Sequence, residues 1–137
     1  MATQTYEVDL VVHDPGGEQS RVFYERAADV QAAVHLVEQA ERAYFSVELD
    51  GGGLSLSVFH AWLAGAHAWL RVDEHREWFA ALPGQQASES RDGVTFSDGD
   101  GSTFTVPAAE TIPRAQVFVA FAHWLATGER TPELAWS

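Results

Sequence analysis

The stretch Ala126-Thr-Gly-Glu-Arg-Thr-Pro-Glu-Leu-Ala-Trp-Ser137 shows how the C-terminal part of the chain is organised. It follows an apolar run from Ala115 to Leu125, and Gly128 stands where a left-handed residue would close a helix over that run. Pro132 prevents the helix from continuing. Trp136 is a large apolar side chain, and an indole near a chain end is normally held against the edge of a core. We therefore expect a helix that stops at Gly128, followed by a tail docked on the core.

Two segments have helical periodicity. In the first, Asp29 has the position of an N-cap, and the apolar residues that repeat through Glu41 are Val30, Ala33, Val34, Val37 and Ala40. In the second, Pro113 suits the first turn, and the apolar stripe consists of Ala115, Phe118, Phe121, Ala122 and Leu125. We assign this stripe and Trp136 to stability alone.

Short segments with strand composition fill the rest of the chain, separated by turns. The expected strands are residues 6–13, 21–24, 44–49, 54–60, 66–72, 77–82, 94–96 and 103–106, with Leu54, Leu56 and Val58 on one face. The expected turns are residues 14–17, 50–53, 63–65, 83–84 and 97–102. The order strand, second short strand, helix, six strands, helix and tail predicts an α+β fold with an antiparallel meandering sheet and both helices packed on one face.

Length and composition limit the class of protein. With 137 residues and 46% apolar side chains, residues 1–137 are expected to form a single domain. The chain has no cysteine, which removes disulfides, thiolate zinc sites and cysteine nucleophiles. Its first residues lack the basic and apolar segments of a secretion signal. The longest nearly apolar run, Val58 to Leu70, is too short to cross a bilayer. We expect a cytoplasmic protein that does not contact membranes.

The charge is strongly negative. Twenty acidic residues face eight basic ones, all of them arginine, and the net charge is −12. Such a surface repels nucleic acids and anionic membranes, so direct binding to either is not expected. It attracts a basic protein partner and speeds the encounter with it. Solubility alone also explains an acidic surface, so the charge favours a basic partner without identifying it.

Three histidines lie close together in sequence, in the near-repeat His60-Ala-Trp-Leu63, His67-Ala-Trp-Leu70 and at His75. If the segment forms a hairpin that turns near Leu63 to Gly65, two histidines approach one another across it. No His-Glu-x-x-His motif or other ligand spacing is present, so the pattern favours partly buried structural histidines over a metal site.

The segment Asp98-Gly-Asp-Gly-Ser102 resembles the start of a calcium loop. A complete loop would need a glutamate at position 109, which is alanine, so a hairpin turn explains the glycines better. Nucleophile elbows and phosphate-binding glycine loops are absent from the sequence, and its paired acids lie in turns. We therefore expect neither a cofactor nor an enzyme.

Several short segments resemble one protein family. They are Gly52–Phe59, Val72–Glu74, Trp78-Phe79, Ile112-Pro113, Phe121–Leu125, Thr127–Pro132 and Leu134–Trp136. Together they resemble the deaminase-associated immunity proteins of bacterial polymorphic toxin systems, over about Leu49 to Trp136. The His-Ala-Trp-Leu near-repeat is not part of that resemblance. The resemblance to this family implies a protein that neutralises a cognate toxin, a nucleic-acid deaminase. It would do so by stoichiometric binding that blocks the active site or the substrate cleft of the toxin.

An acidic edge is the expected contact surface for a basic toxin. Its core is Asp73, Glu74 and Glu77, and Asp50, Asp98 and Asp100 extend it. Trp78, Trp62 or Trp69 can supply an aromatic anchor, and core packing is the alternative role of each.

Two other function classes fit the same sequence. One is a ligand-binding or enzymatic α+β domain that uses the aromatic hairpin as a pocket, with His60, His67 or His75 as its polar group. The other is a secretion chaperone or adaptor, since such proteins are also small, acidic and free of cysteine. A bound metabolite would favour the first, and a partner that stays active in the complex would favour the second.

Overall fold

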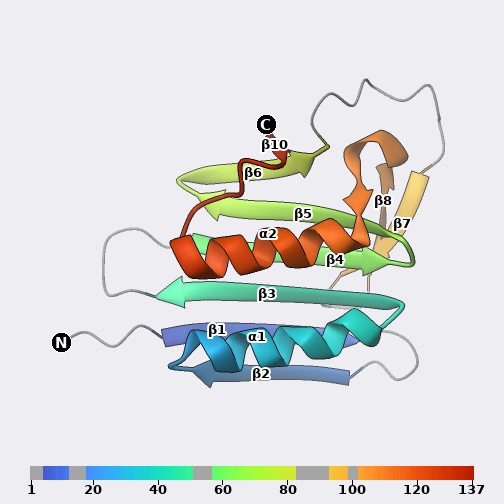
Figure 1. The fold of residues 1–137 in the computed structure, drawn as a ribbon. Coiled ribbons are helices and arrows are strands. Elements are labelled where there is room, and N and C mark those ends of the chain that lie inside the picture. The colour runs from blue at the N-terminus through green and yellow to red at the C-terminus, as the bar shows by residue number, and fades with distance from the viewer. Residues whose placement is uncertain (1–4, 13–17, 51–56, 83–92, 99–101) are drawn as a thin grey trace.

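The computed structural model describes residues 5–12, 18–50, 57–82, 93–98 and 102–137 (Figure 1). Its main sheet has the strand order β10-β6-β5-β4-β3-β1-β2, with β9 paired to β5, and every pairing is antiparallel. The strands are β1 (Thr5–Val12), β2 (Glu18–Tyr24), β3 (Arg42–Asp50), β4 (Ser57–Ala64), β5 (His67–Glu74), β6 (Arg76–Ala81), β9 (Ile112–Pro113) and β10 (Ala135–Trp136). The predicted α+β fold with its antiparallel sheet is confirmed.

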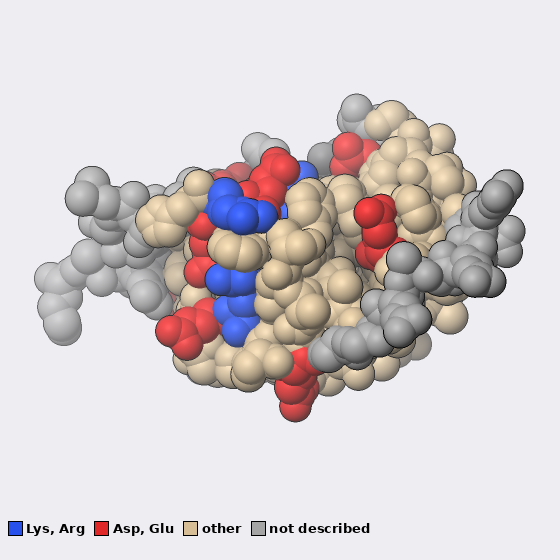
Figure 2. Space-filling model, turned by 90° about the horizontal axis from the view of Figure 1, so that it is seen from above, with Lys and Arg blue, Asp and Glu red and all other residues tan. Residues whose placement is uncertain are grey.

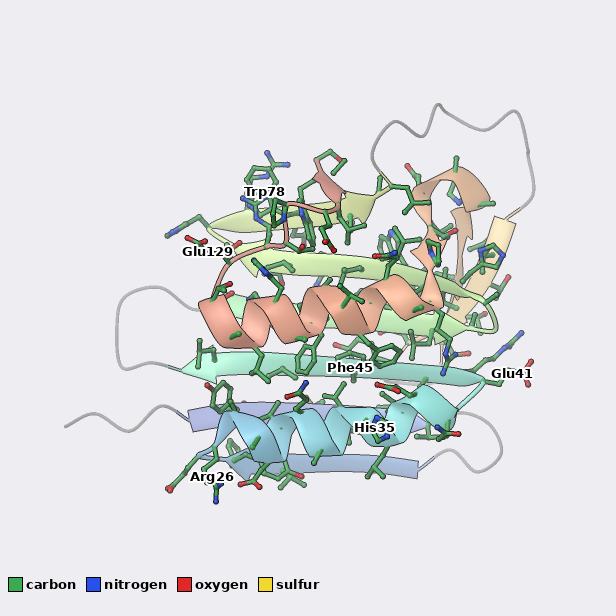
Figure 3. The ribbon with its side chains drawn as sticks, viewed as in Figure 1. Arg26, His35, Glu41, Phe45, Trp78 and Glu129 are labelled. Atoms are coloured by element: carbon green, nitrogen blue, oxygen red, sulfur yellow. The ribbon has the colours of Figure 1, made fainter. Side chains whose placement is uncertain are left out.

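Both helices lie on one face of this sheet, α1 over β1 and α2 over β4 (Figure 1). The helix α1 (Ala27–His35) continues into the 3-10 turn η1 (Leu36–Gln39), and α2 spans Arg114–Thr127. Phe45, labelled in Figure 3, rises from β3 between the helices and has no solvent exposure. Its ring centroid lies 5.6 Å from that of Phe121 on α2 and 6.0 Å from that of Phe59 on β4. The aromatic rings thus join α2 to the middle of the sheet.

A hairpin covers part of the opposite face, which we call the outer face. It consists of β7 (Gly93–Ser97) and β8 (Thr103–Pro107), which form their own two-stranded sheet. Its Phe96 and Val106 are buried together with Trp62 of β4 in a second apolar cluster. The 3-10 turn η2 (Ala108–Glu110) then leads to β9. The sheet is therefore covered on both faces near this hairpin.

The predicted tail is confirmed. Gly128 ends α2 with a φ of 75°, and its N–H donates to the carbonyl of Trp124 at 2.7 Å. The tail then crosses to the sheet, where Trp136 pairs with Ala80 of β6. The indole Nε1 of Trp136 donates to the carbonyl of Thr131 at 2.9 Å, which fixes the ring at the end of the tail. The β6 edge is thereby covered by β10.

Some predicted boundaries and faces were wrong. The first helix begins at Ala27 after an extended Arg26, so Asp29 lies in the first turn and is not the N-cap. The strand β4 runs to Ala64, beyond the predicted end at His60. The buried face of α2 consists of Val117, Ala120, Phe121 and Trp124, whereas the predicted stripe member Ala115 is exposed. Because this helix is apolar around most of its circumference, periodicity did not fix which side faces the sheet.

The remaining turn and strand predictions have different outcomes. The hairpin near Gly65 is confirmed, with Ala64 paired to His67 and a φ of 57° at Gly65. Val58 lies on the outer face, next to the inward-facing Phe59. The turns predicted at 14–17 and 83–84, Leu54 and Leu56 lie outside the described residues. Within the described residues, none of the helices has the length and apolar character needed to span a membrane.

Arg114, the first residue of α2, closes the C-terminal end of the first helix. Its Nη2 donates to the carbonyls of Val37 at 3.0 Å and Glu38 at 3.1 Å, and also to that of Ala40. Its Nη1 donates to the carbonyl of Glu41 at 3.2 Å and to that of Gly65. Burial lowers the pKa of Arg114 below its ordinary value, an effect that the acidic side chains of Glu38 and Glu41 oppose. One guanidinium thus joins the carbonyls at the end of η1 to those of the β3 start and of the β4–β5 turn.

Candidate partner-binding face

The outer face carries a row of residues that crosses five strands, with a carboxylate on four of them. Strand register places Glu7 of β1 opposite Glu48 of β3, and Asp73 of β5 opposite Glu77 of β6. Val58 of β4 lies between the two pairs, opposite both Glu48 and Asp73. Residues directly opposite one another share a face of a sheet. We call Glu7, Glu48, Asp73 and Glu77 the acidic row.

The next row on the outer face is a polar network around His60. His60 Nδ1 lies 3.0 Å from Tyr44 Oη, and His60 Nε2 lies 2.9 Å from Asp73 Oδ2. Arg71 Nε lies 3.1 Å from Asp73 Oδ1, and Arg71 Nη1 lies 3.8 Å from Glu77 Oε1. The Nε–Oδ1 contact is an ion pair without hydrogen-bond geometry, because both atoms are buried without a hydrogen-bond partner. Arg71 therefore neutralises part of the charge at one end of the acidic row.

One tautomer of His60 satisfies both of its shortest contacts, those with Tyr44 and Asp73. If Tyr44 O–H donates to Nδ1 of His60, the neutral imidazole carries its proton on Nε2 and donates it to Asp73. Burial lowers the pKa of His60, Arg71 adds to the shift, and Asp73 opposes it. Burial also raises the pKa of the Tyr44 phenol. Both groups are therefore neutral near neutral pH, and the network holds Asp73 in place.

Aromatic side chains continue the outer face toward the β7–β8 hairpin. The ring centroids of Trp62 and Trp69 lie 4.9 Å apart, and those of Trp69 and Phe79 lie 5.3 Å apart. The indole Nε1 of Trp62 donates to Asp98 Oδ1 at 3.2 Å, which ties the hairpin to β4. Trp62 is buried, whereas Trp69 and Phe79 are half-buried. Of these rings, the last two are the ones that a partner can reach.

The predicted acidic edge is split between the two faces of the sheet. Asp73 and Glu77 point to the outer face, with side-chain exposures of 32% and 60%. Glu74 and Trp78 point to the helix face, where Arg130 Nε lies 3.0 Å from Glu74 Oε2. Of the other predicted residues, Asp98 lies beside Trp62, Asp50 pairs with Thr5 at the end of β3 but its side chain is not described, and Asp100 is outside the described residues.

Trp78, labelled in Figure 3, lies between two arginines. The guanidinium of Arg130 is 3.8 Å from its ring centroid, and that of Arg76 is 4.0 Å away on β6. Figure 2 looks onto the β6–β10 edge of the sheet. Basic (blue) and acidic (red) side chains lie next to each other at one end of this view, and mostly uncharged (tan) surface fills the middle. Since Arg130 belongs to the tail, its contacts with Trp78 and Glu74 fasten the tail to β5 and β6.

The histidines are separated. His60 lies opposite Arg71, His67 Nδ1 is 3.2 Å from Thr111 Oγ1, and His75 occupies the turn between β5 and β6 with a φ of 63°. Among the described residues, no three His, Asp or Glu side chains are placed to hold a metal ion. The backbone N–H of Asp98 donates to the carbonyl of Ser102 at 2.8 Å, as expected of a hairpin turn. The centre of that loop is outside the described residues.

Sequence reasoning missed Glu7, Glu48 and Phe79 as residues of this face. Glu7 and Glu48 are far apart in the chain, and only strand register brings them together. The alternation of polar and apolar residues in 6–10 indicates that Glu7 points away from the core, because it lies between apolar neighbours. It does not indicate which strand pairs with this segment.

Comparison with known proteins identifies the family. The model of the family described as "Immunity protein Imm1" matches residues 18–137. No curated protein matches the chain. The family match covers both helices and every described strand except β1. Because it extends over most of the sequence, the chain belongs to the Imm1 family of immunity proteins.

Proposed function

We propose that this protein neutralises a cognate toxin that acts on nucleic acid, with deaminases as the foremost class, by forming a stoichiometric complex. The complex blocks the active site of the toxin or the path of its substrate. The protein acts in the cytoplasm by binding, without turnover or a cofactor. Membership of the Imm1 family supports the immunity role, and the sequence resemblance to deaminase-associated immunity proteins supports the choice of toxin.

The observation that carries the proposed binding mode is the acidic row. Enzymes that act on nucleic acids present basic surfaces to their substrate, and an acidic face complements such a surface. The protein keeps two pairs of carboxylates directly opposite each other on adjacent strands, Glu7 with Glu48 and Asp73 with Glu77. Arg71 lies against Asp73 and Glu77 and offsets part of their charge. The remaining negative charge of this face favours the approach of a basic partner.

The other predicted contact residues fit around this face. Asp98 belongs to the turn of the β7–β8 hairpin and accepts a hydrogen bond from Trp62, on the same side of the sheet as the acidic row. Glu74 and Trp78 reach the β6 edge from the helix side and already hold the tail through Arg130. We propose that the toxin covers the outer face and reaches these two residues only where it extends around that edge.

The first test is co-expression of the protein with the toxin domain encoded beside it. Rescue of bacterial growth, together with a one-to-one complex on purification, is the expected result. A well-folded protein that neither rescues growth nor binds that toxin would overturn the proposal.

The second test removes charge from the acidic row. The triple variant Glu7→Gln, Glu48→Gln, Glu77→Gln spares Asp73, because Asp73 holds Arg71 and His60. Its control, Glu25→Gln, Asp29→Asn, Glu133→Gln, removes the same charge from exposed positions elsewhere. In stopped-flow or surface plasmon resonance at low salt, we expect the row variant to associate about tenfold more slowly than the control. Equal association rates would show that the toxin does not approach this face.

A further inference from the structure

A small pocket lies where the outer face meets the β6–β10 edge. Its volume is about 260 Å³, and its walls include Trp69, Phe79, Ala81, Ala109, Glu110 and Ser137. Trp69 and Phe79 supply aromatic rings from β5 and β6, and Glu110 supplies a carboxylate from η2. An aromatic wall and one acid therefore come together from three separate elements.

The two rings of the pocket present a flat apolar surface. The ring planes of Trp69 and Phe79 are tilted by 24° with their centroids 5.3 Å apart, so they lie stacked. Phe104 of β8 contacts Trp69 at a centroid distance of 5.3 Å, which limits the movement of the indole. A guanidinium stacks favourably on such rings, because it is planar, cationic and weakly hydrated. The exposed Glu110 can accept two hydrogen bonds from the same group.

The protein already builds this combination of ring, carboxylate and arginine twice. Arg71 lies 5.5 Å from the Trp62 ring and pairs with Asp73. Arg130 lies 3.8 Å from the Trp78 ring and pairs with Glu74.

At the pocket the rings and the acid are present, but within the described part of the chain no arginine lies over Trp69 or Phe79. The pocket also adjoins the acidic row, since Phe79 follows Glu77 on the same face of β6 and lies opposite Arg71. A toxin seated on that row would bring its own basic side chains to the pocket.

We propose that the pocket binds an arginine side chain of the toxin, with its guanidinium stacked on Trp69 and Phe79 and paired with Glu110. This inference rests on the proposed function and names the anchor of that interface. Anchors that fill pockets at an interface determine the dissociation rate, whereas the acidic row acts on the association rate. The two sets of residues therefore have separate kinetic signatures.

Two variants test the pocket in the complex with the toxin. Glu110→Gln removes the charge at an exposed position, and Ala81→Leu fills the pocket from β6 without removing a ring. We expect each variant to raise the dissociation rate about tenfold, while Glu129→Gln, an exposed acid on the tail, leaves it unchanged. Unchanged dissociation for Glu110→Gln, with the melting temperature intact, would overturn the inference. If the unmodified protein does not bind the toxin, the proposed function itself is refuted.

A second measurement requires no toxin. N-acetyl-arginine amide titrated into the isotope-labelled protein is expected to shift the NMR signals of the Trp69 indole and of Phe79, with saturation in the millimolar range. The neutral analogue N-acetyl-citrulline amide has a similar shape and should give no saturable shift. Glu110→Gln should weaken the response to the arginine compound. Equal responses to both compounds would show that the pocket does not select a cation.

Discussion

Replacing Arg114 by methionine tests the idea that a single side chain closes the end of the first helix. Methionine keeps an unbranched apolar stem but loses every donor. Five carbonyls then lose the contact with Arg114, although those of Val37 and Glu41 keep a backbone N–H partner. The contacts to Glu41 and Gly65 lie at the surface, where water can replace them. The contacts to Val37, Glu38 and Ala40 are partly buried, so they dominate the loss.

The expected loss of stability follows from these three contacts. A hydrogen bond to a charged group contributes about 1.5–3 kcal/mol, and bonds from one guanidinium are not additive. We therefore expect the free energy of unfolding to fall by about 3 kcal/mol, because partial rehydration offsets part of the sum. For a domain of this size, that loss lowers the melting temperature by about 10 °C.

The assay is chemical and thermal denaturation followed by circular dichroism. Arg26→Met is the control, because Arg26 is an exposed arginine (labelled in Figure 3) and its loss changes the net charge equally. We expect a change of less than about 0.5 kcal/mol for this control. If Arg114→Met and Arg26→Met destabilise the protein by the same amount, the carbonyl contacts of Arg114 do not stabilise the fold and the reasoning is refuted.

Two further predictions concern the end of α2 and the polar network. Gly128→Ala should lower the free energy of unfolding by about 1 kcal/mol in thermal denaturation, because Gly128 has a φ of 75°, which alanine rarely adopts, even though an added Cβ would have open space. Gly128→Asn should lower it less, since asparagine tolerates this conformation. Equal losses for the two variants would contradict the backbone argument. The pKa of His60 in the folded protein is lowered from 6.5, so the unfolded chain binds more protons and stability should fall as the pH drops below about 6.5. Urea denaturation at about pH 7.5 and about pH 5.5 should show a smaller difference for His60→Gln than for the unmodified protein, and an unchanged difference would exclude His60 as its source.

Features set by local chemistry could be predicted from the sequence. The stop at Gly128 and the hairpin at Gly65 each depend on residues within a few positions of one another. The docking of Trp136 followed from its large apolar ring near the chain end, but its partner strand β6 could not be read from the tail itself. The start of α1 was misplaced because an acid favours both the N-cap and the first turn, and Asp29 occupies the latter. Arg114 gave no signal at all, since its partners lie in a distant segment and are backbone carbonyls.

The candidate site could be predicted only in part. Asp73 and Glu77 lie on one face as an acidic patch, but their sequence neighbours Glu74 and Trp78 point through the sheet to the other side. A cluster in sequence is therefore divided when the strand alternates. The partners of Asp73 and Glu77 in the acidic row come from β1 and β3, and only the pairing of β1 with β3 places Glu7 opposite Glu48. Register of this kind is a tertiary property that local patterns do not encode.

The separate apolar cluster under the β7–β8 hairpin makes the architecture modular. Trp62, Phe96 and Val106 form this cluster, and none of them belongs to the core between the sheet and the helices. Changes in the length or sequence of the hairpin therefore leave the helix-side core untouched as long as this small cluster is refilled. One helix-side core can thus support hairpins of different composition on the opposite face of the same sheet.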